Sequence, residues 1–146
     1  MSKENVDLVI GTIPPPEVDL ALLARDDEQW AQLDAAIGPR FDPDFECATS
    51  LVGKDTVYRG GLQAFRSFWL DWLAPYSTFR LEEIERAIDC GDQVVVVVRH
   101  AAGLKDSEYE IRGRNASIWT LRQRQAVRWE GFPDRAQALK ALGLEE

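Results

Sequence analysis

The sequence predicts a single α+β domain in which helices precede a mixed, mostly antiparallel sheet. Apolar residues at helical spacing dominate the first half of the chain, whereas alternating or continuous apolar runs dominate the second half. Such segregation is typical of α+β proteins rather than of alternating βαβ units. The chain has 146 residues, the usual size of one domain, and we see no internal repeat or linker that would divide it.

Residues 1–41 form a predicted helical segment. Pro14-Pro15-Pro16 interrupts it, because consecutive prolines lack backbone donors and favour an extended chain. A short helix is predicted over residues 17–24. The next helix has Asp26 or Asp27 as its N-cap and Gly38-Pro39 at its end. Its apolar residues recur at helical spacing: Trp30, Leu33 and Ile37.

The clearest helix is predicted over residues 62–73, after a short strand at residues 45–51. Its apolar stripe consists of Leu62, Phe65, Phe68, Trp69, Trp72 and Leu73. Pro75 lies just beyond its end. Aromatic residues at this spacing usually pack in a core. In a fold with an interior cavity part of the same face also walls the pocket, so we predict that Trp69 and Trp72 contact a ligand.

The rest of residues 42–134 is predicted to be sheet. The expected strands are 79–89, 93–101, 108–121 and 126–132. Tight turns are expected at Cys90-Gly91-Asp92 and at residues 122–125. The apolar face of the first of these strands shifts by one residue between Leu81 and Ile84, which indicates a β-bulge that bends the sheet. A short C-terminal helix is predicted over residues 134–143, with an aspartate cap and a terminal glycine.

The strand over residues 108–121 has two different faces. Its odd-numbered face carries Tyr109, Ile111, Gly113, Asn115, Ser117, Trp119 and Leu121. The even-numbered face begins with the charged residues Glu108, Glu110, Arg112 and Arg114, which must contact water. We therefore predict that the odd-numbered face points toward the helices. Small and polar residues in its middle leave space that a close-packed core would fill, which predicts a pocket with hydrogen-bonding groups.

The strand over residues 93–101 contains five consecutive valines, Val94 to Val98, so it is apolar on both sides. A sheet with two apolar faces needs a cover on each of them. The sequence offers no remaining helix for the second cover. We therefore predict a two-fold homodimer through the outer face of the sheet.

Composition excludes several functions. The net charge is −8 and no cluster of Lys and Arg exists that would neutralise phosphates, so we expect no nucleic-acid partner. No apolar stretch is long enough to cross a bilayer, and the N-terminus does not resemble a secretory signal. Cys47 and Cys90 are expected to be reduced thiols in the cytoplasm. One histidine and no Cys/His cluster predict no metal site, and we expect no cofactor.

Five stretches between residues 42 and 144 resemble a known family in order and spacing. They are Asp42-Pro43-Asp44-Phe45-Glu46, Tyr58-Arg59-Gly60, Ile88 to Val96, Ala116 to Leu121, and Phe132 to Leu139. Together they resemble the SnoaL-like family of the nuclear transport factor 2-like superfamily. The resemblance implies a cone-shaped barrel, generally dimeric, with a strongly curved sheet, helices on its concave face and a pocket between them. The triple proline departs from the long first helix usual in the family.

The resemblance also bears on activity, since relatives include isomerases, polyketide cyclases and epoxide hydrolases. Relatives that isomerise steroids keep an acidic base near the first strand and an acid donor in the middle of the long strand. The matching positions here are Cys47 and Ser117, and neither is a carboxylate. Proton transfer on a carbonyl substrate would need carboxyls with separated pKa values. The aspartate–arginine–aspartate set of the epoxide hydrolases has no counterpart either.

Two hypotheses for function remain open. In the first, the protein only binds a small organic ligand or acts as a dimeric interaction module. In the second, it is an enzyme acting on a carbonyl-bearing or polyketide-like molecule. His100, the single histidine, follows the inward valines of its strand and is the best acid or base, with Ser117 as its possible catalytic partner. The predicted ligand-binding residues are Asn115, Trp129, Trp69, Trp72, Cys47, Tyr58 and Gly131. Cys47 has a structural alternative as a small apolar core residue.

Overall fold

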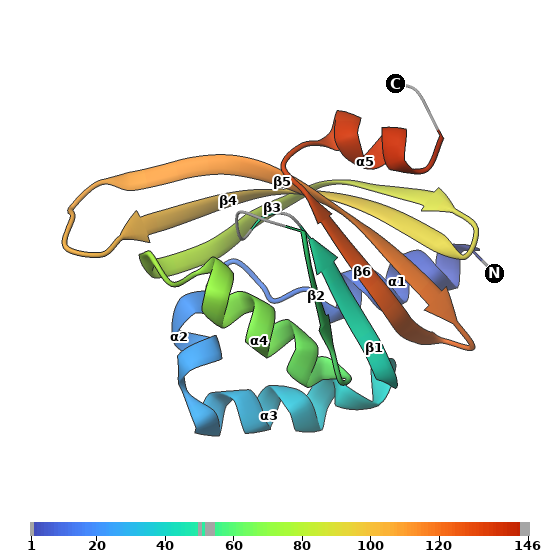
Figure 1. Ribbon diagram of the computed structural model, residues 1–146, viewed down its shortest axis with the longest axis horizontal. Coiled ribbons are helices and arrows are strands. Elements are labelled where there is room, and N and C mark those ends of the chain that lie inside the picture. Colours follow the sequence, from blue (N-terminus) through green and yellow to red (C-terminus); the bar gives the residue numbers. More distant parts are fainter. Residues whose placement is uncertain (1, 50, 52–54, 144–146) are drawn as a thin grey trace.

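In the described part of the chain, four helices lie against one face of a curved sheet and a fifth lies against the opposite face (Figure 1). The computed structural model describes residues 2–49, 51 and 55–143. The helices are α1 (Ser2–Thr12), α2 (Leu20–Arg25), α3 (Asp27–Ile37), α4 (Leu62–Trp72) and α5 (Arg135–Ala141), and a short 3₁₀ turn follows α3 at Gly38–Arg40. The strands are β1 (Phe41–Thr49), β2 (Thr56–Arg59), β3 (Tyr76–Cys90), β4 (Gln93–Leu104), β5 (Glu110–Arg122) and β6 (Gln125–Phe132).

The strands form one mixed sheet in the order β2-β1-β6-β5-β4-β3. Only the β1–β6 pair is parallel among the described strands, and the other neighbours are antiparallel. The register between β3 and β4 shifts between Leu81 and Glu83 and again between Ile84 and Arg86, which confirms the predicted bulge. Such irregularities increase the local twist and let the sheet curve around the helices. The predicted α+β class and the placement of the N-terminal helices on the concave face are therefore confirmed.

α1 lies within the predicted helical segment and ends at Thr12, directly before Ile13 and the triple proline that was expected to interrupt it. One strand, β2, was not expected from the sequence. β2 has only four residues, which is too short for an alternation signal. β1 also begins earlier than predicted, at Phe41. Pro43 is accommodated there because the β1–β6 register shifts between Phe41 and Glu46, where a missing backbone donor costs no ladder bond. Residue 50, within the predicted strand 45–51, lies outside the described residues.

Side-chain caps begin α2 and α3, two of the helices that face the sheet. The Asp26 carboxylate accepts from Gln29 N (2.9 Å) and begins α3, as predicted. Asp19 does the same for α2, where its Oδ1 accepts from Ala21 N (3.0 Å), and it also accepts from Phe79 N on β3 (3.0 Å). Because one carboxylate serves both the helix and the edge strand, the start of α2 is held against β3.

The concave face and α1–α4 enclose the main core. Its largest fully buried side chains include Val9, Leu20, Phe45, Phe68, Leu73, Phe79, Val94 and Val96. The predicted apolar stripe of α4 faces this core. Phe65 lies at its centre, with ring centroids 5.4 Å from Trp69, 5.6 Å from Trp119 and 5.4 Å from Trp129. Aromatic packing thus joins α4 to β5 and β6 across the interior.

The prediction that no helix remains to cover the outer face is wrong. A second buried cluster on that face consists of Val95, Val97, Ala116, Ile118, Ala138 and Leu139. The last two belong to α5, which folds back over the sheet after Phe132 (Figure 1). The sequence did predict this helix, with Asp134 as its cap, but periodicity alone did not tell which face of the sheet it covers. The valines of β4 therefore have a cover within the same chain.

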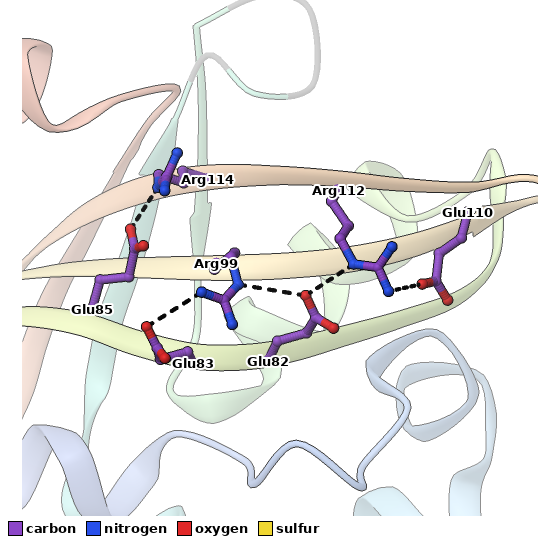
Figure 2. Close-up of polar contacts among 7 residues, drawn as sticks. All are labelled: Glu82, Glu83, Glu85, Arg99, Glu110, Arg112 and Arg114. Carbon is purple, nitrogen blue, oxygen red and sulfur yellow. Dashed lines mark hydrogen bonds and ion pairs between the residues drawn. The ribbon is translucent and has the colours of Figure 1, made fainter.

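A group of ion pairs lies on the outer face of β3, β4 and β5 (Figure 2). The ion pairs are Glu85–Arg114 (2.7 Å), Glu83–Arg99 (3.4 Å), Glu82–Arg99 (3.6 Å), Glu82–Arg112 (3.4 Å) and Glu110–Arg112 (2.7 Å). We call these seven residues of β3, β4 and β5 the Glu-Arg ladder. The Arg114 guanidinium beside Glu85 holds the pKa of that carboxyl below its usual range. Exposed pairs of this kind contribute little individually, so the ladder marks a solvated surface.

The inward direction of the odd-numbered face holds for only part of the predicted strand. Asn115 to Leu121 follow it, but Ile111 is exposed, and Tyr109 precedes β5 with 80% of its surface exposed. The physical reason is that the β4–β5 hairpin projects past the helices at this end (Figure 1), so nothing covers that stretch of the face.

The cover supplied by α5 is testable. Leu139→Ala should lower the free energy of unfolding by about 2 kcal/mol, because it removes a buried side chain and leaves a cavity over the valines. Leu22→Ala on α2 is the matched control, since Leu22 is 52% exposed, and it should change stability by less than about 0.5 kcal/mol. Urea denaturation measures both. Equal effects of the two substitutions would contradict the placement of α5.

Candidate functional site

A cavity of about 60 Å³ lies between the concave face of the sheet and the helices. One ordered water needs roughly 10–15 Å³ on the same measure, so there is room for a small molecule or a few waters. Aromatic side chains form much of the wall: Phe41, Phe65, Trp69, Trp72, Trp119 and Trp129. Leu20 of α2 and the Ile13-Pro14 segment after α1 close it on the helix side. The site is thus assembled from segments far apart in the sequence.

Asn115 and Ser117 line this cavity from the middle of β5. Asn115 is 7% exposed and Ser117 is 6% exposed. Both side chains therefore point inward and line the cavity, while their contact with a ligand stays a prediction. Pairing with β4 explains their depth, because Asn115 lies opposite Val98 and Ser117 opposite Val96, in the covered part of the sheet.

The polar groups of the cavity carry no charge. Thr12, Asn115 and Ser117 are the polar side chains among the described residues that line it. The Thr12 hydroxyl donates to the Val9 carbonyl (2.7 Å), which leaves its oxygen able to accept. A cavity with a few neutral hydrogen-bonding groups on apolar walls suits an uncharged ligand, because an unpaired charge would lose its hydration without compensation.

His100 lies beside the cavity rather than on its wall. Its Nδ1 is 3.0 Å from the Asn115 amide nitrogen, so the histidine contacts the site through Asn115. The imidazole stacks on Phe79 at 4.8 Å between centroids and lies over Gly113, where a Cβ atom would come within 3.0 Å of Nε2. The predicted space at Gly113 is therefore occupied by the His100 ring. Burial lowers the pKa of His100 below its ordinary value, against a smaller opposing effect of Glu82.

The predicted Ser117–His100 pair is not assembled. His100 lies opposite Gly113 on β5, four residues from Ser117. Four residues along a strand span about 13 Å, far beyond hydrogen-bond reach. Ser117 consequently has no base beside it, and nucleophilic catalysis through this pair has no geometric support.

The remaining predicted site residues divide into two groups. Trp69, Trp72 and Trp129 line the cavity, whereas Cys47, Tyr58 and Gly131 are not among its lining residues. Core packing and local hydrogen bonds explain the positions of Cys47, Tyr58 and Gly131.

Cys47 is fully buried in the core, and burial raises the pKa of its thiol well above the usual range. That behaviour is typical of an inert core cysteine. The Tyr58 hydroxyl donates to the Asp71 carboxylate (2.8 Å) and so ties β2 to α4, and burial together with this bond raises the pKa of Tyr58. Gly131 makes room for the Trp129 ring, which occupies the position that a Cβ atom would take.

Sequence reasoning missed several wall residues. Phe65 is predicted only as part of the apolar stripe of residues 62–73, and no role is predicted for Phe41, yet both line the cavity. Thr12 and the Ile13-Pro14 segment have no sequence pattern that predicts a place in the cavity wall. They line it together with residues of β4 and β5 only because the chain folds over the sheet at this point.

Other functional groups are not assembled in the described part of the chain. No carboxylate lines the cavity there, so an acid–base pair of the steroid-isomerase kind is not formed. No three His, Cys, Asp or Glu side chains of these residues lie close enough together to hold a metal ion. The helices of residues 2–49 and 55–143 are too short or too polar to cross a membrane.

The single histidine makes its protonation directly measurable. An NMR titration of the His100 ring protons should give a pKa below 6.5, because burial disfavours the imidazolium form. The unfolded chain in urea is the reference. Since the unfolded state then binds the proton more readily, this group should reduce stability as the pH falls below about 6.5. A folded-state pKa equal to or above the urea value would show that the ring is not desolvated.

Solved structures resemble this chain over nearly its whole length. The crystal structure of TerC, crystallised with polyporic acid, is 20% identical over 95% of this chain and 97% of that one, with a TM-score of 0.63. A candidate SnoaL-like polyketide cyclase from Jannaschia sp. CCS1 is 14% identical over 99% and 95%, with a TM-score of 0.64. An NTF2-like protein of unknown function from Burkholderia pseudomallei K96243 is 15% identical over 94% and 95%, with a TM-score of 0.63.

No protein-family model and no curated protein matches this sequence. Structural likeness at such low identity establishes the fold and leaves activity to be argued from the site. The predicted resemblance is confirmed at this level: the chain has the nuclear transport factor 2-like fold of the SnoaL-like and NTF2-like structures.

Proposed function

We propose that this protein binds a small, uncharged, largely aromatic or otherwise flat organic molecule in the cavity between sheet and helices. The observation that carries the proposal is the wall itself, with aromatic rings around Asn115 and Ser117. Aromatic walls contribute apolar contact and ring packing, while the amide and hydroxyl orient a polar atom of the ligand.

The size of the cavity limits the ligand. About 60 Å³ accommodates a molecule of a few non-hydrogen atoms in this conformation. A larger ligand would require movement of a wall element. The segment at Ile13-Pro14 is the candidate for that movement, since it connects α1 to α2 and belongs to neither helix.

A structural neighbour supports binding of organic molecules by this fold. TerC was crystallised with polyporic acid. We infer from this only a ligand class, a small organic molecule, and not a particular compound.

The alternative function is an enzyme acting on a carbonyl-bearing or polyketide-like molecule. Its support is the fold shared with a candidate polyketide cyclase. The described cavity lacks a carboxylate, and Ser117 lacks a base, so the residues present favour binding over catalysis. We also infer a reducing compartment such as the cytoplasm, because Cys47 and Cys90 are both free thiols.

Binding can be tested with a cavity-filling variant. A panel of small neutral aromatic compounds is screened by thermal shift, where a ligand of the native state raises the melting temperature. Val96→Phe should abolish the shift, because its ring would occupy the cavity. Val57→Phe on the exposed side of β2 is the matched control and should keep the shift.

Circular dichroism shows whether Val96→Phe remains folded. If Val96→Phe unfolds, Ser117→Val is used in its place, because it adds less volume at the same cavity wall. A panel that produces no shift with the unmodified protein, or a shift that survives both cavity substitutions, would contradict binding in this cavity.

The homodimer predicted from the sequence is a further part of this proposal. Since α5 covers the apolar cluster of the outer face, we propose that a second copy packs against the Glu-Arg ladder beside it. Such an interface is ionic, and salt screens it. We expect light scattering after gel filtration to give a dimer at low ionic strength that dissociates near 1 M NaCl. A monomer under both conditions, or a dimer indifferent to salt, would contradict this interface.

A further inference from the structure

The Asn115 amide lies between two environments. Its side chain lines the cavity, and its nitrogen is 3.0 Å from His100 Nδ1. An amide has a donor end and an acceptor end, so the end that contacts His100 determines which end the cavity receives. The hydrogen-bonding character of the pocket is therefore coupled to a residue that does not line it.

The protonation of His100 decides the orientation of this amide. When Nδ1 carries a lone pair, it accepts from the Asn115 NH₂ group, and the Asn115 carbonyl oxygen faces the cavity. When the ring is doubly protonated, both nitrogens are donors, so Nδ1 requires the carbonyl oxygen. The amide must then turn over and present its NH₂ group to the cavity.

The surroundings of His100 favour the neutral ring. It is half-buried, stacked on Phe79, with Trp72 of α4 at 6.5 Å between centroids. Glu82 on β3 is the charged group that acts on it and favours the proton, while burial has the larger, opposite effect. Among the facing residues of the other packed elements, Trp72, Gly113 and Asn115 carry no charge. Asp71 on α4 is engaged by Tyr58.

The two neutral forms of the ring are also not equivalent. With the proton on Nδ1, the Asn115 oxygen would be used by His100, and two N–H donors would face a largely aromatic cavity. With the proton on Nε2, the Asn115 amide presents its carbonyl oxygen to the cavity instead. Buried N–H groups without a partner are rarer and more costly than carbonyls with an unused lone pair. The second arrangement is therefore favoured when the cavity holds no ligand.

We propose that His100 is a positioning residue that presents the Asn115 carbonyl oxygen to the cavity, so that the site selects neutral ligands carrying a hydroxyl or N–H donor, and that protonation of His100 reverses this selection. This inference rests on the proposed binding function and adds the ligand class. It gives the single histidine a role as a determinant of ligand polarity, without a catalytic step.

The test uses three small neutral rings. Pyrrole carries an N–H donor, furan has the same shape without a donor, and cyclopentanone offers only an acceptor. NMR titration measures their dissociation constants one pH unit above and one unit below the measured His100 pKa. At the higher pH, pyrrole should bind about 10-fold more tightly than furan, the equivalent of one net hydrogen bond. At the lower pH this preference should disappear. The affinity of cyclopentanone should then rise relative to that of pyrrole.

Two variants separate positioning from packing. His100→Phe keeps an aromatic ring against Phe79 but removes Nδ1, so furan should bind as before while the pyrrole preference and its pH dependence are lost. Asn115→Leu should remove the preference at every pH. The side-chain amide signals of Asn115 provide a second readout, since they should shift with the titration of His100 in the unmodified protein and not in His100→Phe. If His100→Phe does not fold, the pH dependence of the pyrrole and furan dissociation constants of the unmodified protein tests the role of His100.

The outcomes distinguish this inference from the binding proposal. If none of the rings binds, the binding function fails for this ligand class, and the inference fails with it. If pyrrole and furan bind equally at both pH values, the cavity is a binding site but His100 does not set its polarity. A preference for pyrrole that survives in His100→Phe would likewise overturn the role of the histidine.

Discussion

The antiparallel register between β4 and β5 is the constraint on which the candidate site depends. It places Val96 opposite Ser117, Val98 opposite Asn115 and His100 opposite Gly113. A slip of one residue would turn every side chain of β5 to the other face, sending the amide and hydroxyl into the Glu-Arg ladder. Because the valines on one side of β4 pack under the helices and those on the other under α5, burial on both faces opposes such a slip.

The two covers of the sheet have different consequences. On the outer face, the small cluster under α5 is buried, and the charged ladder beside it is solvated. On the concave face, the helices arrive from separate parts of the chain and meet large aromatic rings that do not fill the interior completely, which leaves the cavity. The fold alone does not assign an activity, since proteins with the same architecture differ in what they do. Ligand binding is therefore inferred from the neutral, aromatic wall of the cavity.

Local patterns in the sequence predicted much of this structure correctly. The apolar stripe of α4, the Asp26 cap, the turn at Cys90-Gly91-Asp92 and the bulge in β3 each depend on neighbouring residues, and all are present. α1 lacked a clear apolar stripe, and β2 was too short to show alternation. Tyr109 continued the inward pattern of β5, yet it is exposed because no helix reaches that end of the hairpin.

By itself the sequence determined the class of fold and the inward face of the long strand from Asn115 to Leu121, which includes Ser117. These follow from periodicity, which is a property of consecutive residues. Only the tertiary structure decided that α5 covers the outer face, that Thr12 joins the cavity wall and that His100 contacts Asn115 instead of Ser117. Contacts of that kind depend on strand register and on the return path of the chain, which no local pattern encodes.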